Sequence, residues 1–226
     1  MTRNRLMTLE SNQRDRQALR DRLLEATLPH VVFDGWGMAA LEAGARDLGL
    51  EIGHIHAVFA SPAKDLASHF SDWADRRMLL RLSALDLPAM RVRERITLAV
   101  RLRLQELAGH QEAVRRLAGF LILPGNASLA ARNGYRSVDA IWRVAGDKAV
   151  DFNFYTKRAL LGAVLVTTTL HWLDDTSADH GETWAFLDRR IAGVMGIPKL
   201  QAQAKGFAAK LTKPLRDLGI GGFSGT

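Results

Sequence analysis

The stretch that decides the fold runs from Trp142 to Arg190 and reads WRVAGDKAVDFNFYTKRALLGAVLVTTTLHWLDDTSADHGETWAFLDRR. Aromatic and charged residues crowd its first third, and a long apolar run from Ala159 to Leu173 follows. Gly146 can adopt the left-handed conformation that ends many helices. Asp147 and Asp151 can accept hydrogen bonds from the free N–H groups that begin the next helix. We therefore expect one helix to end near Gly146 and a second, strongly apolar helix to start shortly after it.

Helical spacing of apolar residues continues on both sides of this stretch, and no segment alternates as a strand would. Gly and Pro mark the helix ends. A Pro fits the first turn of a helix, so Pro88 is expected to open one. The apolar stripes place Leu80 and Val92 on inward faces. The expected helices are one ending at Asp34, then 38–48, 51–59, one from Ser61-Pro62, one from Pro88, 111–123, 128–145, 152–173, 182–195 and 199–218.

Composition favours a helical protein with a substantial core. The chain has 226 residues, 47% of them hydrophobic, and no cysteine, which excludes disulfides and thiolate metal sites. No apolar stretch near the N-terminus resembles a signal peptide. The run from Ala159 to Leu173 is shorter than the roughly 20 residues that a membrane-spanning helix needs. The formal net charge is +7, and its excess lies in residues 76–116 and 199–217.

The phrases AGD, DFNFYTKR, TTTL, DD-S and TW-FL-RR resemble the Coq-nine family, the accessory lipid-binding proteins of ubiquinone biosynthesis. The resemblance runs from about Leu19 to about Gly196. It implies an all-α, TetR-like helical bundle with three parts: a helix-turn-helix head over 1–60, a lipid-binding and dimerisation body over 61–196, and a basic amphipathic helix and tail over 197–226. It also implies a polyprenyl quinone intermediate or other lipid as ligand, and the di-iron demethoxyubiquinone hydroxylase as partner.

The TetR-like architecture further implies a homodimer, formed through the helices expected over 152–173 and 182–195. A helix-turn-helix head raises the alternative of a TetR-type transcriptional regulator that senses a hydrophobic ligand. Its landmarks are the Gly35-Trp36 turn and Phe59 ahead of Ser-Pro. The recognition helix of such a head needs basic side chains, because affinity for DNA comes chiefly from contacts with phosphate groups. Residues 51–60 contain no Lys or Arg, so we expect a retained scaffold that does not bind DNA.

The helix expected over 152–173 is apolar on nearly every side. That pattern is typical of a central core helix. With the family resemblance, it also suggests the wall of a lipid cavity, where burial of an apolar tail needs no polar contact. The residues assigned to lipid binding are Leu160, Leu161, Val164, Leu165 and Thr168.

The polar and aromatic junction before this helix has two interpretations. Its charges can serve as helix caps and local ion pairs. Trp, Tyr and Arg are also the residues enriched at binding hot spots, and the resemblance implies a surface for the hydroxylase. The residues assigned to partner binding are Trp142, Asp147, Tyr155, Lys157 and Arg158.

The C-terminal segment has an apolar stripe flanked by lysines. This pattern is typical of a helix at a membrane interface and attracts anionic lipid, although packing on the domain or on a second subunit fits it too. The residues assigned to membrane binding are Leu200, Phe207, Lys210, Leu211 and Leu215. We expect a protein peripheral to the inner membrane on its cytoplasmic side in a bacterium, or on the matrix side in a mitochondrion.

No catalytic, cofactor or metal motif is recognisable. His54 and His56 are two residues apart and therefore point to different faces of a short helix. The sequence Asp174-Asp175-Thr176-Ser177 is typical of a helix exit and capping turn rather than of an acid–base pair. We therefore expect no cofactor and no enzymatic activity, but a protein that presents a quinone intermediate to the hydroxylase.

Overall fold

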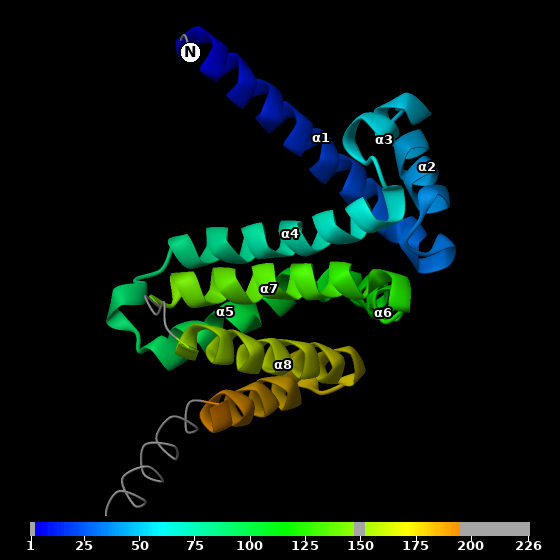
Figure 1. Ribbon diagram of the computed structural model, residues 1–226. Helices are drawn as coiled ribbons and strands as arrows, with labels where there is room; N and C mark the ends of the chain where they lie inside the picture. Colours follow the sequence, from blue (N-terminus) through cyan, green and yellow to red (C-terminus); the bar gives the residue numbers. More distant parts are fainter. Residues whose placement is uncertain (1–2, 147–151, 195–226) are drawn as a thin grey trace, which may run out of the picture.

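The computed structural model describes residues 3–146 and 152–194, with side chains described over 11–146 and 155–194. Every regular element in these ranges is helical, which confirms the all-α prediction. Figure 1 shows two parts: a small head with a long projecting first helix, and a layered bundle beside it.

The head consists of α1 (Arg3–Asp34), α2 (Met38–Asp47) and α3 (Ile52–Val58). Its two tight turns need left-handed backbone, which glycine adopts without strain: Gly35 has φ +73° and Gly49 has φ +66°. The helices α1 and α2 cross closely at Gly44, which lies against Thr27. The predicted helix-turn-helix arrangement of helices is therefore present.

The body begins at α4 and ends with helical residues 181–194. In Figure 1, α4, α7 and α5 lie above α8, and the helix of residues 181–194 lies beneath α8. Its elements are α4 (Pro62–Ser83), η1 (Leu87–Ala89), α5 (Val92–Glu106), η2 (Ala108–His110), α6 (Gln111–Leu121), η3 (Pro124–Asn126), α7 (Ala127–Val144), α8 (Phe152–Asp174) and η4 (Ala178–His180).

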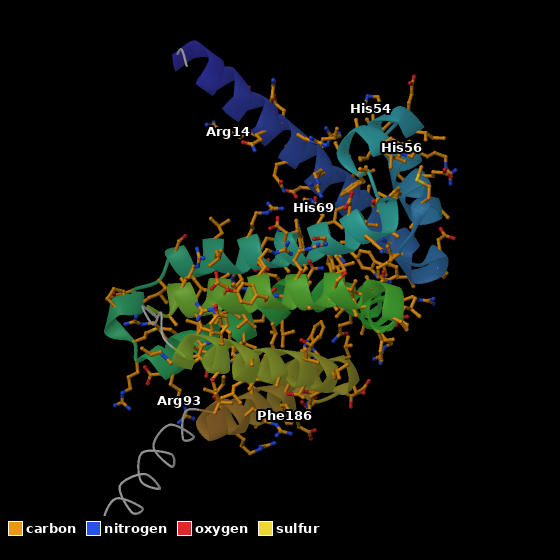
Figure 2. The ribbon with its side chains drawn as sticks, viewed as in Figure 1. Arg14, His54, His56, His69, Arg93 and Phe186 are labelled. Carbon is orange, nitrogen blue, oxygen red and sulfur yellow. The ribbon has the colours of Figure 1, made fainter. Side chains whose placement is uncertain are left out.

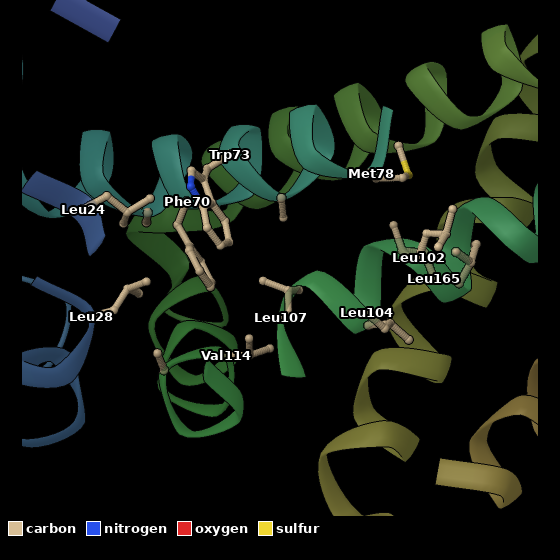
Figure 3. Packing of buried hydrophobic residues seen from close by; sticks show 14 of the residues in the cluster. Leu24, Leu28, Phe70, Trp73, Met78, Leu102, Leu104, Leu107, Val114 and Leu165 are labelled. Carbon is tan, nitrogen blue, oxygen red and sulfur yellow. The ribbon is translucent and has the colours of Figure 1, made fainter. Parts of the chain in front are cut away.

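One continuous core joins the head to the body. Trp36, in the turn between α1 and α2, packs against Phe70 of α4 with ring centroids 5.2 Å apart. Its indole N–H donates to the Ala113 carbonyl at 3.1 Å. Figure 3 shows buried side chains from both parts in contact around this junction, including Leu24, Leu28, Phe70, Trp73, Leu107 and Val114. The head is thus held by apolar burial against α4 and α6.

Three predictions about the middle of the chain were wrong. Pro88 does not open a helix: it lies in η1, and α5 begins only at Val92. There the Glu94 carboxylate accepts from the Arg91 N–H at 2.8 Å, which supplies the helix start. Leu80 is 72% exposed because the buried stripe of α4 continues through other residues, and Val92 is 39% exposed at the first turn of α5.

Candidate functional site

The residues assigned to lipid binding divide between two faces of α8. Leu161, Leu165 and Thr168 are buried on the inner face, within the core of the body. Val164 is also buried, and together with the half-buried Leu160 it lines a groove between α8 and the helix of residues 181–194. The core-helix interpretation therefore fits the inner face, and a ligand-binding interpretation fits the groove.

The groove has a volume of about 400 Å³ and a mostly apolar floor. Two arginines from the 181–194 helix border it. Arg190 stacks on Phe186, with its guanidinium carbon 4.8 Å from the ring centroid. Phe186 in turn stacks on His171 of α8, with the two ring centroids 4.6 Å apart. Figure 2 labels Phe186 on this helix. The described residues that line the groove are Leu160, Ala163, Val164, Thr167, Arg189, Arg190, Gly193 and Val194.

The residues assigned to partner binding are not all at the surface. Trp142 is 3% exposed and Arg158 is 6% exposed. Arg158 donates from Nε and Nη2 to Asp139 at 2.9 and 2.8 Å. The expectation that the Trp142 and Arg158 side chains lie at the surface is therefore wrong, while their assignment to partner binding stays a prediction.

The rest of the junction is built around these two buried side chains. The Trp142 indole N–H donates to the Lys157 carbonyl at 3.3 Å, and the Lys157 ammonium lies 5.5 Å from the Trp142 ring centroid. Tyr155 is 70% exposed, so it remains a candidate for direct contact with a partner. Gly146 has φ +88°, as its predicted role at a helix end requires.

Other predicted residues lie outside the described ranges. They comprise the expected cap residues Asp147 and Asp151, the helix expected over 199–218, and the membrane-binding residues Leu200, Phe207, Lys210, Leu211 and Leu215. Their assignments stay predictions.

The turn after α8 is a capping motif, as predicted. Asp175 accepts hydrogen bonds from the Ser177 N–H and hydroxyl at 2.8 and 2.6 Å, and from the Thr183 N–H and hydroxyl at 2.8 and 2.6 Å. These hydrogen bonds from Ser177 and Thr183 hold the pKa of the Asp175 carboxyl well below its usual range. This carboxylate therefore caps the start of the helix of residues 181–194.

A polar cluster at the head–body junction was not foreseen. Asp21 of α1 accepts from His69 of α4 at 2.8 Å and from both terminal nitrogens of Arg76 at 3.0 and 2.6 Å. His69 is 3% exposed, and burial together with the nearby Arg20 charge lowers its pKa to about 4. No local pattern signals this cluster, because its members lie about 50 positions apart in the chain.

Across the described ranges, no group of three or more His, Asp or Glu side chains is arranged to hold a metal ion. His54 and His56 are exposed on α3, and Figure 2 shows both on the head, away from the body. Among the same residues, no helix is both long and apolar enough to cross a bilayer. Among the described residues, the groove beside α8 is a candidate site for an apolar ligand.

These features define a class of protein: an all-helical, TetR-like bundle with an apolar groove beside α8. In agreement, a solved TetR transcriptional regulator from Nitrosomonas europaea superposes with a TM-score of 0.66 over 79% of this chain and 98% of that one, at 20% identity. That likeness concerns the fold.

Sequence comparison identifies the family. Residues 127–198 match the COQ9 family model. The mitochondrial ubiquinone biosynthesis protein COQ9 of Rattus norvegicus is 30% identical over 91% of this chain and 68% of its own length. The Homo sapiens protein of the same name is 30% identical over 91% of this chain and 67% of its own length. The chain belongs to the COQ9 family, and its role lies in ubiquinone biosynthesis.

Proposed function

We propose that this protein is a non-catalytic accessory factor that binds a polyprenyl quinone intermediate at the membrane surface and presents it to the demethoxyubiquinone hydroxylase. Two observations support the proposal: membership of a family named for ubiquinone biosynthesis, and the apolar groove beside α8. The chemistry then belongs to the hydroxylase, and this protein supplies binding and positioning.

The groove suits part of an isoprenoid chain. Burial of apolar surface contributes about 25 cal/mol per Å², so a hydrocarbon segment binds there without any polar contact. Leu160 and Val164 supply apolar surface from α8, and Val194 supplies it from the facing helix. Thr167 and Ala163 are exposed on the same side of α8, so the groove is open to a ligand from the membrane.

The surface for the hydroxylase is proposed at the junction that precedes α8. Tyr155 provides an exposed aromatic ring there. Trp142 and Arg158 hold the backbone beneath it through their contacts with Lys157 and Asp139. In this arrangement Tyr155 contacts the partner, while the two buried residues determine where it lies.

The C-terminal segment is proposed to attach the protein to a membrane that contains anionic lipid. Its lysines and apolar residues alternate with helical spacing over residues 199–218. The relatives reported above are named as mitochondrial. A matching site of action for this chain is the inner-membrane surface.

The experiment that tests lipid binding uses Gly193→Leu. A Cβ at Gly193 would meet no atom within 4 Å, so a leucine there enters open space and occupies the groove. We expect wild-type protein to carry an isoprenoid quinone or its precursor near one per chain, measured by mass spectrometry of an organic extract. The variant should carry several-fold less.

Gly119→Leu is the matched control. Gly119 is exposed on α6, outside the groove, and a Cβ there also meets nothing within 4 Å. Its extract should contain as much quinone as the wild type. Wild-type protein without isoprenoid lipid, or equal loading of Gly193→Leu and wild type, would contradict the proposal.

A further inference from the structure

We propose that the same groove also takes acidic lipids with one hydrocarbon chain, such as a long-chain fatty acid, and that these compete with the neutral isoprenoid. The inference rests on the proposed function only in that both ligands place a hydrocarbon chain between α8 and the facing helix. It adds a charge preference and a form of regulation, which come from the two arginines at the groove.

The charge at the groove is positive and uncompensated. Arg189 and Arg190 line it, and no acidic residue is among its described lining residues. Within the described part of the chain, neither arginine forms an ion pair. Asp188 is next to them in sequence and is exposed, but its backbone carbonyl faces Arg93 of α5 at 3.5 Å. Arg93, labelled in Figure 2, lies outside the described lining of the groove.

The arginines are held in a way that suits a carboxylate. The Arg190 guanidinium stacks on Phe186, and Phe186 is itself fixed by its stacking on His171. A guanidinium that lies over a ring face can still donate from the edge of its own plane, where its N–H groups point. That planar fork matches the two oxygens of a carboxylate.

The size of the groove favours one chain over two. Its volume of about 400 Å³ lies near the lower end of the roughly 300–1,000 Å³ typical of ligand sites. A fatty acid places a single chain along Leu160 and Val164 and its carboxylate at the arginines. A diacyl phospholipid would leave its second chain in water.

Calorimetric titration with oleate and with oleyl alcohol, both below their aggregation concentrations, tests the inference. The two ligands share one chain and differ in headgroup charge. The readout is the ratio of their affinities, so a general loss of binding does not count as support. We expect wild-type protein to bind oleate about 25-fold more tightly, since each arginine near a negative headgroup contributes roughly fivefold.

The double variant R189Q/R190Q should bring this ratio close to one. Arg132→Gln is the matched control, because Arg132 is exposed on α7 and outside the groove; it should keep the wild-type ratio. Circular dichroism melts of all three proteins establish that they fold. Added oleate should also displace bound isoprenoid from the wild type.

The outcomes separate this inference from the proposed function. If the wild type binds the alcohol and oleate equally, or if R189Q/R190Q keeps the preference, the charge preference is overturned while lipid binding stands. If neither ligand binds, the groove holds no chain, and both proposals fail. Equal or tighter arginine-dependent binding of a diacyl phosphatidic acid would overturn the single-chain preference.

Discussion

At the scale of single residues, His69 links protonation to the attachment of the head. It lies between Phe59 of the head, with ring centroids 5.7 Å apart, and the Asp21 carboxylate at 2.8 Å. Burial and the charge of Arg20 lower its pKa from 6.5 to about 4, and the Arg76 charge acts in the same direction. The folded protein therefore keeps this imidazole neutral where an unfolded chain would protonate it.

The expected consequence is a loss of stability on acidification. Between about pH 6.5 and about pH 4 the unfolded chain binds the proton and the folded protein does not, so the free energy of unfolding falls as the pH falls through this window. Asp21, whose pKa is lowered by hydrogen bonds from Arg76 and His69 against the opposing effect of its own desolvation, adds to the loss only at lower pH. Urea unfolding near pH 7 and near pH 5 measures the effect.

His69→Gln should reduce this pH dependence, because glutamine can donate to Asp21 but does not titrate. Some slope should remain from His110, whose pKa burial also lowers. His54→Gln serves as the control, since His54 is exposed, and it should behave as the wild type does. An unfolding free energy that is equal at the two pH values in the wild type would contradict the prediction.

Gly44 lies where α1 and α2 cross, and the crossing leaves no room for a side chain there. A Cβ at this position would lie 2.8 Å from the Thr27 nitrogen and 2.9 Å from its Cα. Because those atoms belong to the α1 backbone, the two helices would have to separate. Gly44→Ala should therefore lower the free energy of unfolding by about 1–3 kcal/mol, measured by urea denaturation.

The same substitution at Gly134 should have the opposite sign. Gly134 lies inside α7, and a Cβ there meets nothing within 4 Å. Alanine restricts the unfolded chain and should stabilise the protein by about 0.4–1 kcal/mol. Equal stability changes for Gly44→Ala and Gly134→Ala would mean that the α1–α2 crossing tolerates a methyl group.

At the scale of elements, one buried ion pair fixes how α4, α5 and α7 pack. Arg103 of α5 donates to Asp75 of α4 at 2.7 Å, and the Ser137 hydroxyl of α7 donates to the other oxygen of Asp75 at 2.8 Å. The side chains of Arg103 and Asp75 are 11% and 5% exposed. Three helices thus share one carboxylate away from water.

Removal of the Asp75 charge should strongly lower the free energy of unfolding. Asp75→Asn leaves Arg103 buried without a full counter-charge, and loss of one partner of a buried pair typically destabilises by about 3–5 kcal/mol. Glu112→Gln, in the exposed pairs with Arg115 and Arg116, should change stability by less than about 1 kcal/mol. Urea unfolding curves for both variants test the contrast; comparable losses would show that the Asp75 pair is not effectively buried.

The ends of elements could be read from local sequence, while the pairing of elements could not. Gly35, Gly49 and Gly146 have the positive φ that their turn roles require, so the predicted helix ends there were confirmed. The prediction that Pro88 opens an α-helix was wrong, because proline also fits a 3₁₀ turn. Asp75 and Arg103 are 28 residues apart, and no local spacing connects them.

At the candidate site too, local sequence predicted the elements but not how their side chains pack. On α8 both faces are apolar, so periodicity predicted the helix but did not separate the groove residue Leu160 from the core residue Leu161. Trp and Arg are enriched at interfaces and also form buried structural pairs, so residue type alone placed Trp142 and Arg158 wrongly at the surface. Arg189 lines the groove but was not predicted, because arginines late in a helix are also favoured by the helix dipole.

At the scale of the whole molecule, positive charge is absent where a DNA-binding head needs it. The helix α3 contains no Lys or Arg, and one basic residue near it is already engaged, since Arg16 of α1 donates to the Ala57 carbonyl at 2.8 Å. Phosphate contacts supply most of the affinity for DNA. We therefore expect the head not to bind DNA, and its observed contribution is packing against α4.

The outer face of α8 indicates how two copies of the molecule would meet. Val166 is 58% exposed and Leu170 is 50% exposed, and with Ala159 they form an exposed apolar stripe at helical spacing. A two-fold axis brings the same stripe of both copies together, so each apolar residue of the stripe contributes to the interface from both subunits. We expect a homodimer whose interface lies along α8, beside the groove.

The double variant V166E/L170E should convert this dimer to a monomer. Four like charges brought together in one apolar interface outweigh the burial that holds it. Size-exclusion chromatography with light scattering over a range of concentrations measures the mass, with Ile122→Glu as control because Ile122 is 83% exposed at the end of α6. A wild type that is monomeric throughout, or a variant that keeps the dimer mass, would place the contact between copies elsewhere and leave the α8 stripe available to another partner.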